Sequence, residues 1–65
     1  MLIHHPHVQR TALRLMRACG DRALIEARQW ARHFAEAGES AERRVWLLVC
    51  LELREHRSQA LARAA

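Results

Sequence analysis

Three histidines stand close together near the N-terminus, at positions 4, 5 and 7. Imidazole is a common ligand of zinc, nickel and copper, so His4, His5 and His7 are the candidates for a metal site. No acidic residue or cysteine lies near them in the sequence, and the chain has neither an HExxH nor a CxxC motif. We therefore interpret them as part of a polar arm and expect no metal or other cofactor. A small metal-binding protein is the third of three functional hypotheses.

Arginines recur at helical spacing just after these histidines. Arg10, Arg14 and Arg17 fall on one face of a helix, and such a stripe could contact phosphates. All eleven basic residues are arginines, the formal net charge is +4, and Gln9 is the only nearby side chain suited to reading bases. We interpret the stripe as a solvated face, and a small nucleic-acid-binding regulator is the second hypothesis.

The remaining chemistry-bearing residues do not form a catalytic set. Cys19 and Cys50 have no base at a recognisable spacing, and two cysteines are too few for a disulfide scaffold. A chain of 65 residues also has little room for a formed pocket. We expect no enzyme, but a cytoplasmic protein with two reduced, buried thiols. The chain shows no secretory signal, and its longest apolar run is far shorter than the ~20 residues needed to cross a bilayer.

That apolar run, residues 45–51, is the most informative feature of the sequence. On a helical wheel it makes two stripes. One faces the predicted core, and the other, nearly opposite, holds Leu47, Leu48 and Leu51, which we call the leucine face. Covering three leucines fully is worth roughly 5–8 kcal/mol, and two short helices cannot cover both stripes. We therefore predict an interface with another molecule, formed by Leu47, Leu48, Leu51, Trp46, Cys50 and Arg54.

Pro6, Gly20 and Gly38 divide the chain into an arm and helical segments. We predict a single helical domain over 1–65, with a flexible arm at 1–5 and helices at about 6–19, 22–37 and 41–61. Asp21 and Ser40 are the expected N-caps of the second and third helices. The fold class is all-α, a compact three-helix domain with a long C-terminal helix. Trp30 and Phe34 are expected to supply most of the bulk on the buried face of the middle helix.

Short motifs in the sequence resemble a group of small bacterial helical proteins that have no assigned function. The shared features are an aliphatic helix ending in glycine, an alanine-spaced helix, an Ala-Gly-acidic turn and a Val-Trp pair. They cover residues 11–54, as Thr11-Ala12, Leu15-Met16, Gly20, then Ala23, Ala27, Ala31, then Ala37-Gly38-Glu39, then Val45-Trp46 and Leu53. The chain departs from the group's pattern at Ser40-Ala41-Glu42. The resemblance implies a compact helical fold and no catalytic residues.

These observations lead to a first hypothesis of a non-enzymatic interaction protein. Small chains bury a modest fraction of their surface, and association is a common remedy. We predict a homodimer formed through the third helix, because a two-fold pair is the commonest closed assembly. Its role would be that of an accessory or regulatory subunit, and the same surface could dock on a larger protein.

Overall fold

The computed structural model describes residues 5–64, and this part of the chain is all-helical, without a strand. Its elements are α1 (Pro6–Cys19), the short 3-10 helix η1 (Gly20–Arg22), α2 (Ala23–Glu36) and α3 (Ser40–Ala64). The molecule has a radius of gyration of 12.1 Å and measures 41 × 27 × 16 Å along its principal axes. It is therefore compact but elongated along α3.

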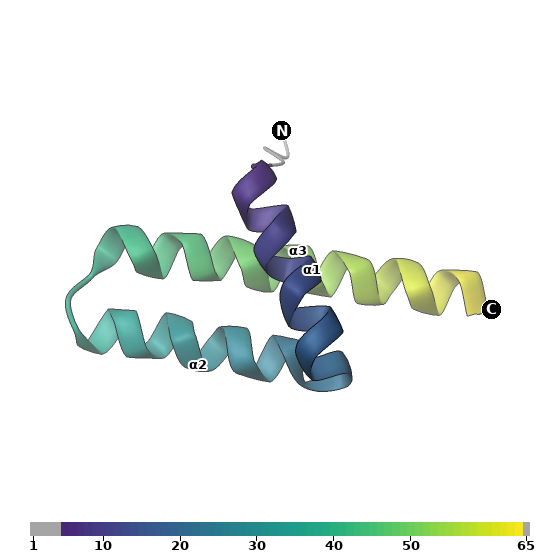
Figure 1. Ribbon diagram of the computed structural model, residues 1–65, viewed down its shortest axis with the longest axis horizontal. Helices are drawn as coiled ribbons and strands as arrows, with labels where there is room; N and C mark the ends of the chain where they lie inside the picture. Colours follow the sequence, from purple (N-terminus) through teal and green to yellow (C-terminus); the bar gives the residue numbers. More distant parts are fainter. Residues whose placement is uncertain (1–4, 65) are drawn as a thin grey trace.

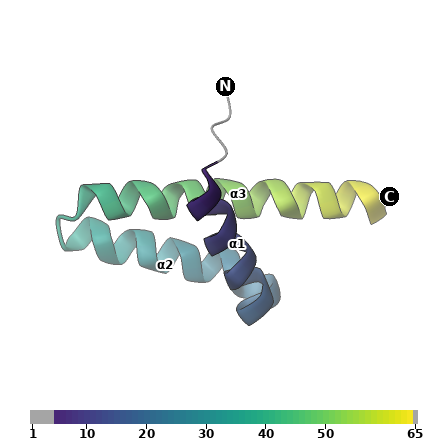
Figure 2. The ribbon, with the colours of Figure 1, turned by 45° about the horizontal axis from the view of Figure 1, so that its top comes forward.

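The arrangement differs from a regular three-helix domain. The main unit is a pair of helices, because α2 and α3 run antiparallel and side by side as a hairpin (Figure 1). α1 does not lie alongside them as a third parallel member but crosses the pair steeply (Figures 1 and 2). The three-residue η1 turn sends the chain from α1 directly into α2.

Small side chains let the helices approach closely where they meet. Ala12 on α1 and Ala27 on α2 are both fully buried, as is Val49 on α3. Alanine suits these positions because it favours the helix and adds no bulk between two backbones. The same cluster of buried residues contains Val8, Ala23, Cys50 and Leu53.

The turn between α2 and α3 is closed by Gly38, as the sequence predicts. Gly38 has a φ of +75°, in the left-handed region that glycine enters without strain. The Gly38 N–H donates to the Ala35 carbonyl (3.2 Å), and the Glu39 N–H donates to the Phe34 carbonyl (2.9 Å). This pair of bonds is the Schellman arrangement, which satisfies the last carbonyls of α2.

Two predicted N-caps are wrong. Asp21 lies within η1 and caps nothing, because the Ala23 N–H already donates to the Gly20 carbonyl across the 3-10 turn. No side chain caps α2. Ser40 is the first residue of α3 and not the residue before it, since the Arg43 N–H donates to the Glu39 carbonyl at 3.0 Å.

The two ends of the described chain also differ from expectation. His5 belongs to the capped start of α1, because its Nδ1 accepts from the His7 N–H at 3.2 Å and Pro6 follows in the first helical position. The rest of the predicted arm, residues 1–4, lies outside the described residues. At the other end, α3 continues past Leu61 to Ala64. Its last turns contain no glycine or proline and are rich in helix-favouring alanine.

Candidate self-association surface

The apolar run at the start of α3 divides between two sides of the helix. Val49 and Leu53 are buried against α1 and α2, with exposed fractions of 0% and 5%. Leu47, Leu48 and Leu51 are 41%, 45% and 55% exposed. Val49 is two residues from Leu47 and from Leu51, which places those leucines about 200° around the helix from it. The leucine face is therefore directed away from the core.

The other three predicted interface residues lie in different places. Cys50 is buried at 8% exposure in the chain's own core, so its assignment to an interface is wrong. It lies on the margin of the core stripe, and its small side chain turns inward beside Val49. Trp46 is half-buried and packs against the core. Arg54 is exposed.

An aromatic cluster lies across the α2–α3 hairpin, where the sequence predicts core. Trp30 is 44% exposed, so it does not provide core bulk as expected. Its ring stacks on Trp46 (centroids 5.7 Å apart) and on Phe34 (6.0 Å). His33 meets Phe34 edge to face at 5.1 Å. The alanines of α2 occupy the innermost positions, so the large rings are displaced to the edge of the interface between the helices.

Both cysteines are free thiols. Burial raises the pKa of the Cys50 thiol above its ordinary value, although Arg28 and Arg54 partly offset this by favouring the thiolate. A raised pKa makes a thiol a weaker nucleophile at neutral pH. Cys50 is therefore suited to a structural role and not to covalent chemistry.

Two further charged residues lie on the leucine face. Arg44 is one turn before Leu48, and Glu55 is one turn after Leu51, at the four-residue spacing that brings helical side chains together. Arg44 is exposed and Glu55 is half-buried. Helical periodicity alone continues the leucine face into Arg54, Glu55 and Ser58, but sequence reasoning did not pair Glu55 with Arg44. The signal that could have found this pair is the position of the two charges, one at each end of the leucines on one face.

The residues of the two alternative hypotheses lie on α1. Arg10, Arg14 and Arg17 are all exposed. His5 and His7 meet edge to face at 6.3 Å, and His5 is occupied as the helix cap. Within residues 5–64, no group of three or more His, Cys, Asp or Glu side chains could hold a metal ion. The third predicted ligand, His4, lies outside that range.

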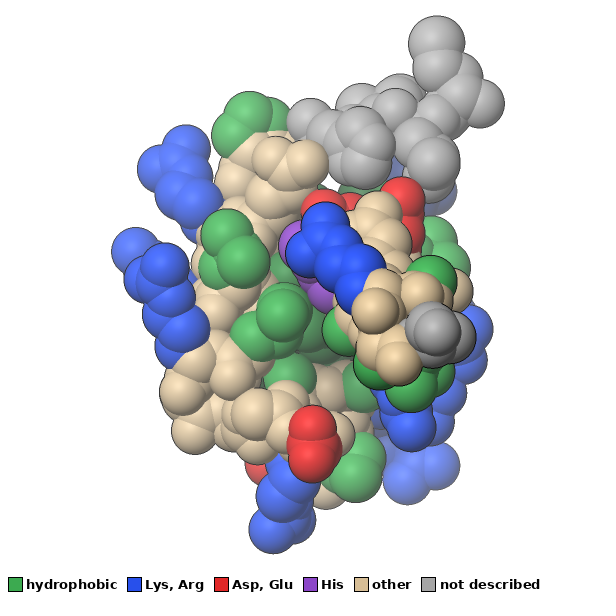
Figure 3. All heavy atoms as spheres, turned by 90° about the vertical axis from the view of Figure 1, so that its right-hand side faces the viewer, with side chains coloured by type: hydrophobic (Ala, Val, Ile, Leu, Met, Phe, Trp, Pro, Cys, Tyr) green, Lys and Arg blue, Asp and Glu red, His purple; other side chains and the backbone are tan. Residues whose placement is uncertain are grey.

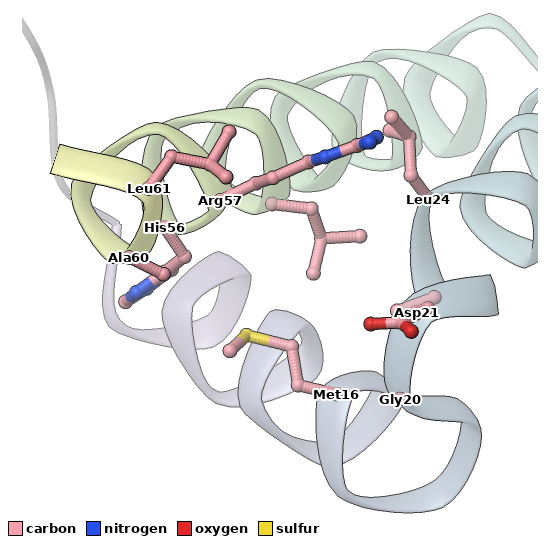
Figure 4. A pocket seen from close by; sticks show the side chains of 10 residues that line it. Met16, Gly20, Asp21, Leu24, His56, Arg57, Ala60 and Leu61 are labelled. Atoms are coloured by element: carbon pink, nitrogen blue, oxygen red, sulfur yellow. The ribbon is translucent and has the colours of Figure 1, made fainter. Parts of the chain in front are cut away.

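A groove opens where α3 extends beyond the other helices. Its volume is about 610 Å³, and side chains from every helical element surround it (Figure 4). Hydrophobic side chains gather in the hollow between α1 and the end of α3 (Figure 3). The lining residues are Met16, Gly20, Asp21, Ala23, Leu24, Leu53, His56, Arg57, Ala60 and Leu61. Because it includes the buried Leu53, the groove lies on the core side of α3, away from the leucine face.

No described helix is both long and apolar enough to span a membrane. Comparison with protein families, with curated proteins and with solved structures finds no match to this chain.

Proposed function

We propose that the chain is a non-enzymatic interaction protein that self-associates through the leucine face of α3. The observation that supports this most directly is the exposure of 41–55% at Leu47, Leu48 and Leu51 on the side of α3 opposite the core. Leucines grouped in this way on a polar helix are typical of a contact surface. A two-fold pair would cover both copies of the face at once.

The exposed fractions set the expected strength of this association. About half of each leucine is already covered, so burying the rest in two chains contributes roughly 5–8 kcal/mol. Association itself costs on the order of 4–15 kcal/mol. The net gain is therefore about 4 kcal/mol at most, so we expect a weak, reversible dimer with a dissociation constant of about 1 mM or above.

The test is a matched pair of substitutions. Leu51→Glu places a charge in the leucine face, whereas Ile25→Glu places one at an equally exposed apolar residue on α2 (48% exposed). Sedimentation equilibrium should show dimer for the unaltered chain and for Ile25→Glu, and monomer for Leu51→Glu. Helical circular dichroism should be unchanged in both variants. Equal masses for the two variants would refute the leucine face as the contact.

We further propose that the protein acts in the cytoplasm as an accessory or regulatory subunit of a larger protein. The two free thiols support a reducing location. A larger partner and a second copy would compete for the same leucine face. Leu51→Glu should then abolish both contacts, and Ile25→Glu neither. The resemblance to small bacterial helical proteins likewise remains a proposal.

A second candidate function, nucleic-acid binding, is favoured by the exposure of Arg10, Arg14 and Arg17 along α1. Contacts of this kind release counterions, so affinity for a labelled duplex would fall by orders of magnitude over a few-fold rise in salt. Replacing the three arginines by alanine would abolish binding if the stripe is the site. For the third hypothesis, metal content after dialysis of the purified chain tests the N-terminal histidines.

A further inference from the structure

The two charges of the leucine face are arranged symmetrically about its leucines. Arg44 and Glu55 are eleven residues apart, or about three helical turns, so they lie on nearly the same line of α3. Leu48 and Leu51 lie between them. The midpoint of Arg44 and Glu55 falls between residues 49 and 50, and so does the midpoint of Leu48 and Leu51.

Neither charge has an opposite charge close to it along α3. Side chains three or four residues apart on a helix are neighbours. At those spacings, the neighbours of Arg44 are Ser40, Ala41, Leu47 and Leu48, and those of Glu55 are Leu51, Glu52, Ser58 and Gln59. The core side of the same helix is different, because His56 Nε2 lies 3.7 Å from Glu52 Oε1. Arg44 and Glu55 are therefore suited to pairing with charges on another molecule.

This symmetry identifies a partner that fits the face. We infer that a second copy of the chain docks antiparallel on the leucine face, with the two-fold axis between residues 49 and 50. Leu48 then meets the partner's Leu51, and Arg44 meets the partner's Glu55, and each contact occurs twice. The inference rests on the proposed self-association and specifies its direction and register.

Other registers match the face less well. Placing Leu47 against the partner's Leu51 brings Arg44 against the partner's Arg54. Placing Leu51 against the partner's Leu51 brings Leu48 against the partner's Arg54 and Leu47 against the partner's Glu55. A parallel pair sets each charge against its own copy. Like-charge contacts disfavour the first and the parallel arrangement, and two leucines opposed by charges disfavour the second. The inferred register opposes only Leu47 to a charge, because residue 47 then faces residue 52 of the second copy.

Charge reversal tests the register. Arg44→Glu and Glu55→Arg each convert two attractive contacts into two repulsive ones, so each should weaken dimerisation about tenfold at low ionic strength. The double variant restores opposite charges in the antiparallel register, and its dissociation constant should return to within about threefold of the unaltered value. Arg32→Glu makes the same charge change at an exposed position of α2, away from the leucine face, so it is the matched control and should change little.

The outcomes separate the two proposals. An unaltered chain that stays monomeric at high concentration overturns the proposed self-association itself. A chain that dimerises through the leucine face, but whose double variant stays as weak as the single variants, overturns the register alone. The same conclusion follows if neither single reversal weakens the dimer.

A distance measurement gives an independent result if a reversed variant fails to fold. A spin label can be placed at exposed Ser58 through Ser58→Cys, after Cys19→Ser and Cys50→Ala remove the native thiols. In the inferred register the two labels are offset by seventeen residues, or about 25 Å along the helices. A parallel pair would bring them side by side, and a short distance would therefore overturn the inference.

Discussion

Trp30 on α2 and Trp46 on α3 stack across the hairpin, with ring centroids 5.7 Å apart and planes 19° from parallel. Phe34 extends the stack from the next turn of α2. Aromatic pairs of this kind contribute about 0.5–1.5 kcal/mol beyond the area that they bury. The stack therefore stabilises the hairpin although Trp30 lies largely outside the core.

Trp30→Ala should lower the free energy of unfolding by about 1–2 kcal/mol, because it removes the stack and its buried area but opens no internal cavity. Trp30→Phe keeps a ring at the position and should cost less than half as much. Urea unfolding followed by circular dichroism measures both. Equal losses for the two variants would show that the stack contributes nothing specific.

Ala27→Leu should destabilise the fold by about 1–3 kcal/mol, because a larger side chain cannot fit where α2 meets its neighbours without shifting a helix. Ala27 has no exposed surface. Ala35→Leu, at an exposed position of the same helix, makes the same chemical change and should have little effect. Thermal unfolding of the two variants measures the difference. A neutral Ala27→Leu would contradict the close approach of the helices.

Gly38→Ala should cost about 1–2 kcal/mol through the backbone alone, since a side chain at positive φ is strained. A Cβ atom at this position would meet nothing within 4 Å, so steric overlap does not contribute. Gly38→Asn should cost less, because asparagine tolerates the left-handed region better than alanine. Chemical unfolding of the two variants gives the order. A loss at asparagine equal to that at alanine would argue against this account of the turn.

The Cys50 thiol should make stability fall at alkaline pH. Its pKa is raised by burial in the folded chain, so the unfolded chain loses this proton first as pH rises. The contribution is intact below the ordinary thiol value of about 8.5 and is lost progressively as pH rises through the raised folded pKa. The chain contains neither lysine nor tyrosine, so few other groups titrate in this window.

Denaturant unfolding between neutral and alkaline pH measures this loss, and Cys50→Ala should flatten the alkaline part of the profile. The thiol should also react more slowly than the half-buried Cys19 with a disulfide reagent at neutral pH. A profile that Cys50→Ala leaves unchanged would contradict the assigned cause.

The sequence predicts much of this fold because the residues that begin and end the helices act locally. Gly38 ends α2, Pro6 opens α1, and the alanine spacing of α2 marks its buried face, since each depends on backbone conformation or side-chain size alone. The crossing of α1 over the hairpin was not predictable in this way, because it follows from the 3-10 turn at Gly20–Arg22 and from packing with α3. The exposure of Trp30 has the same origin, since the closeness of two helices decides which residue on the apolar face fits inside.

Helical periodicity predicts part of the leucine face, but not every residue near it. The two stripes of α3 separate by helical periodicity alone, and the exposure of Leu47, Leu48 and Leu51 in the structure agrees with that separation. The inward position of Cys50 could not be read from the wheel, because a residue at the margin of a stripe turns either way according to its neighbours. The proposed pairing of Arg44 with a second copy depends on two chains, so the pattern of one helix does not reveal it.

The most direct test of the central claim is the mass of the unaltered chain as its concentration rises, measured by sedimentation equilibrium at low ionic strength. The account predicts a reversible shift from 7.6 kDa, the mass of one chain, toward twice that value. Most of the shift should occur at concentrations of about 1 mM and above. A mass that remains at 7.6 kDa throughout, with the helices intact, would contradict self-association through the leucine face.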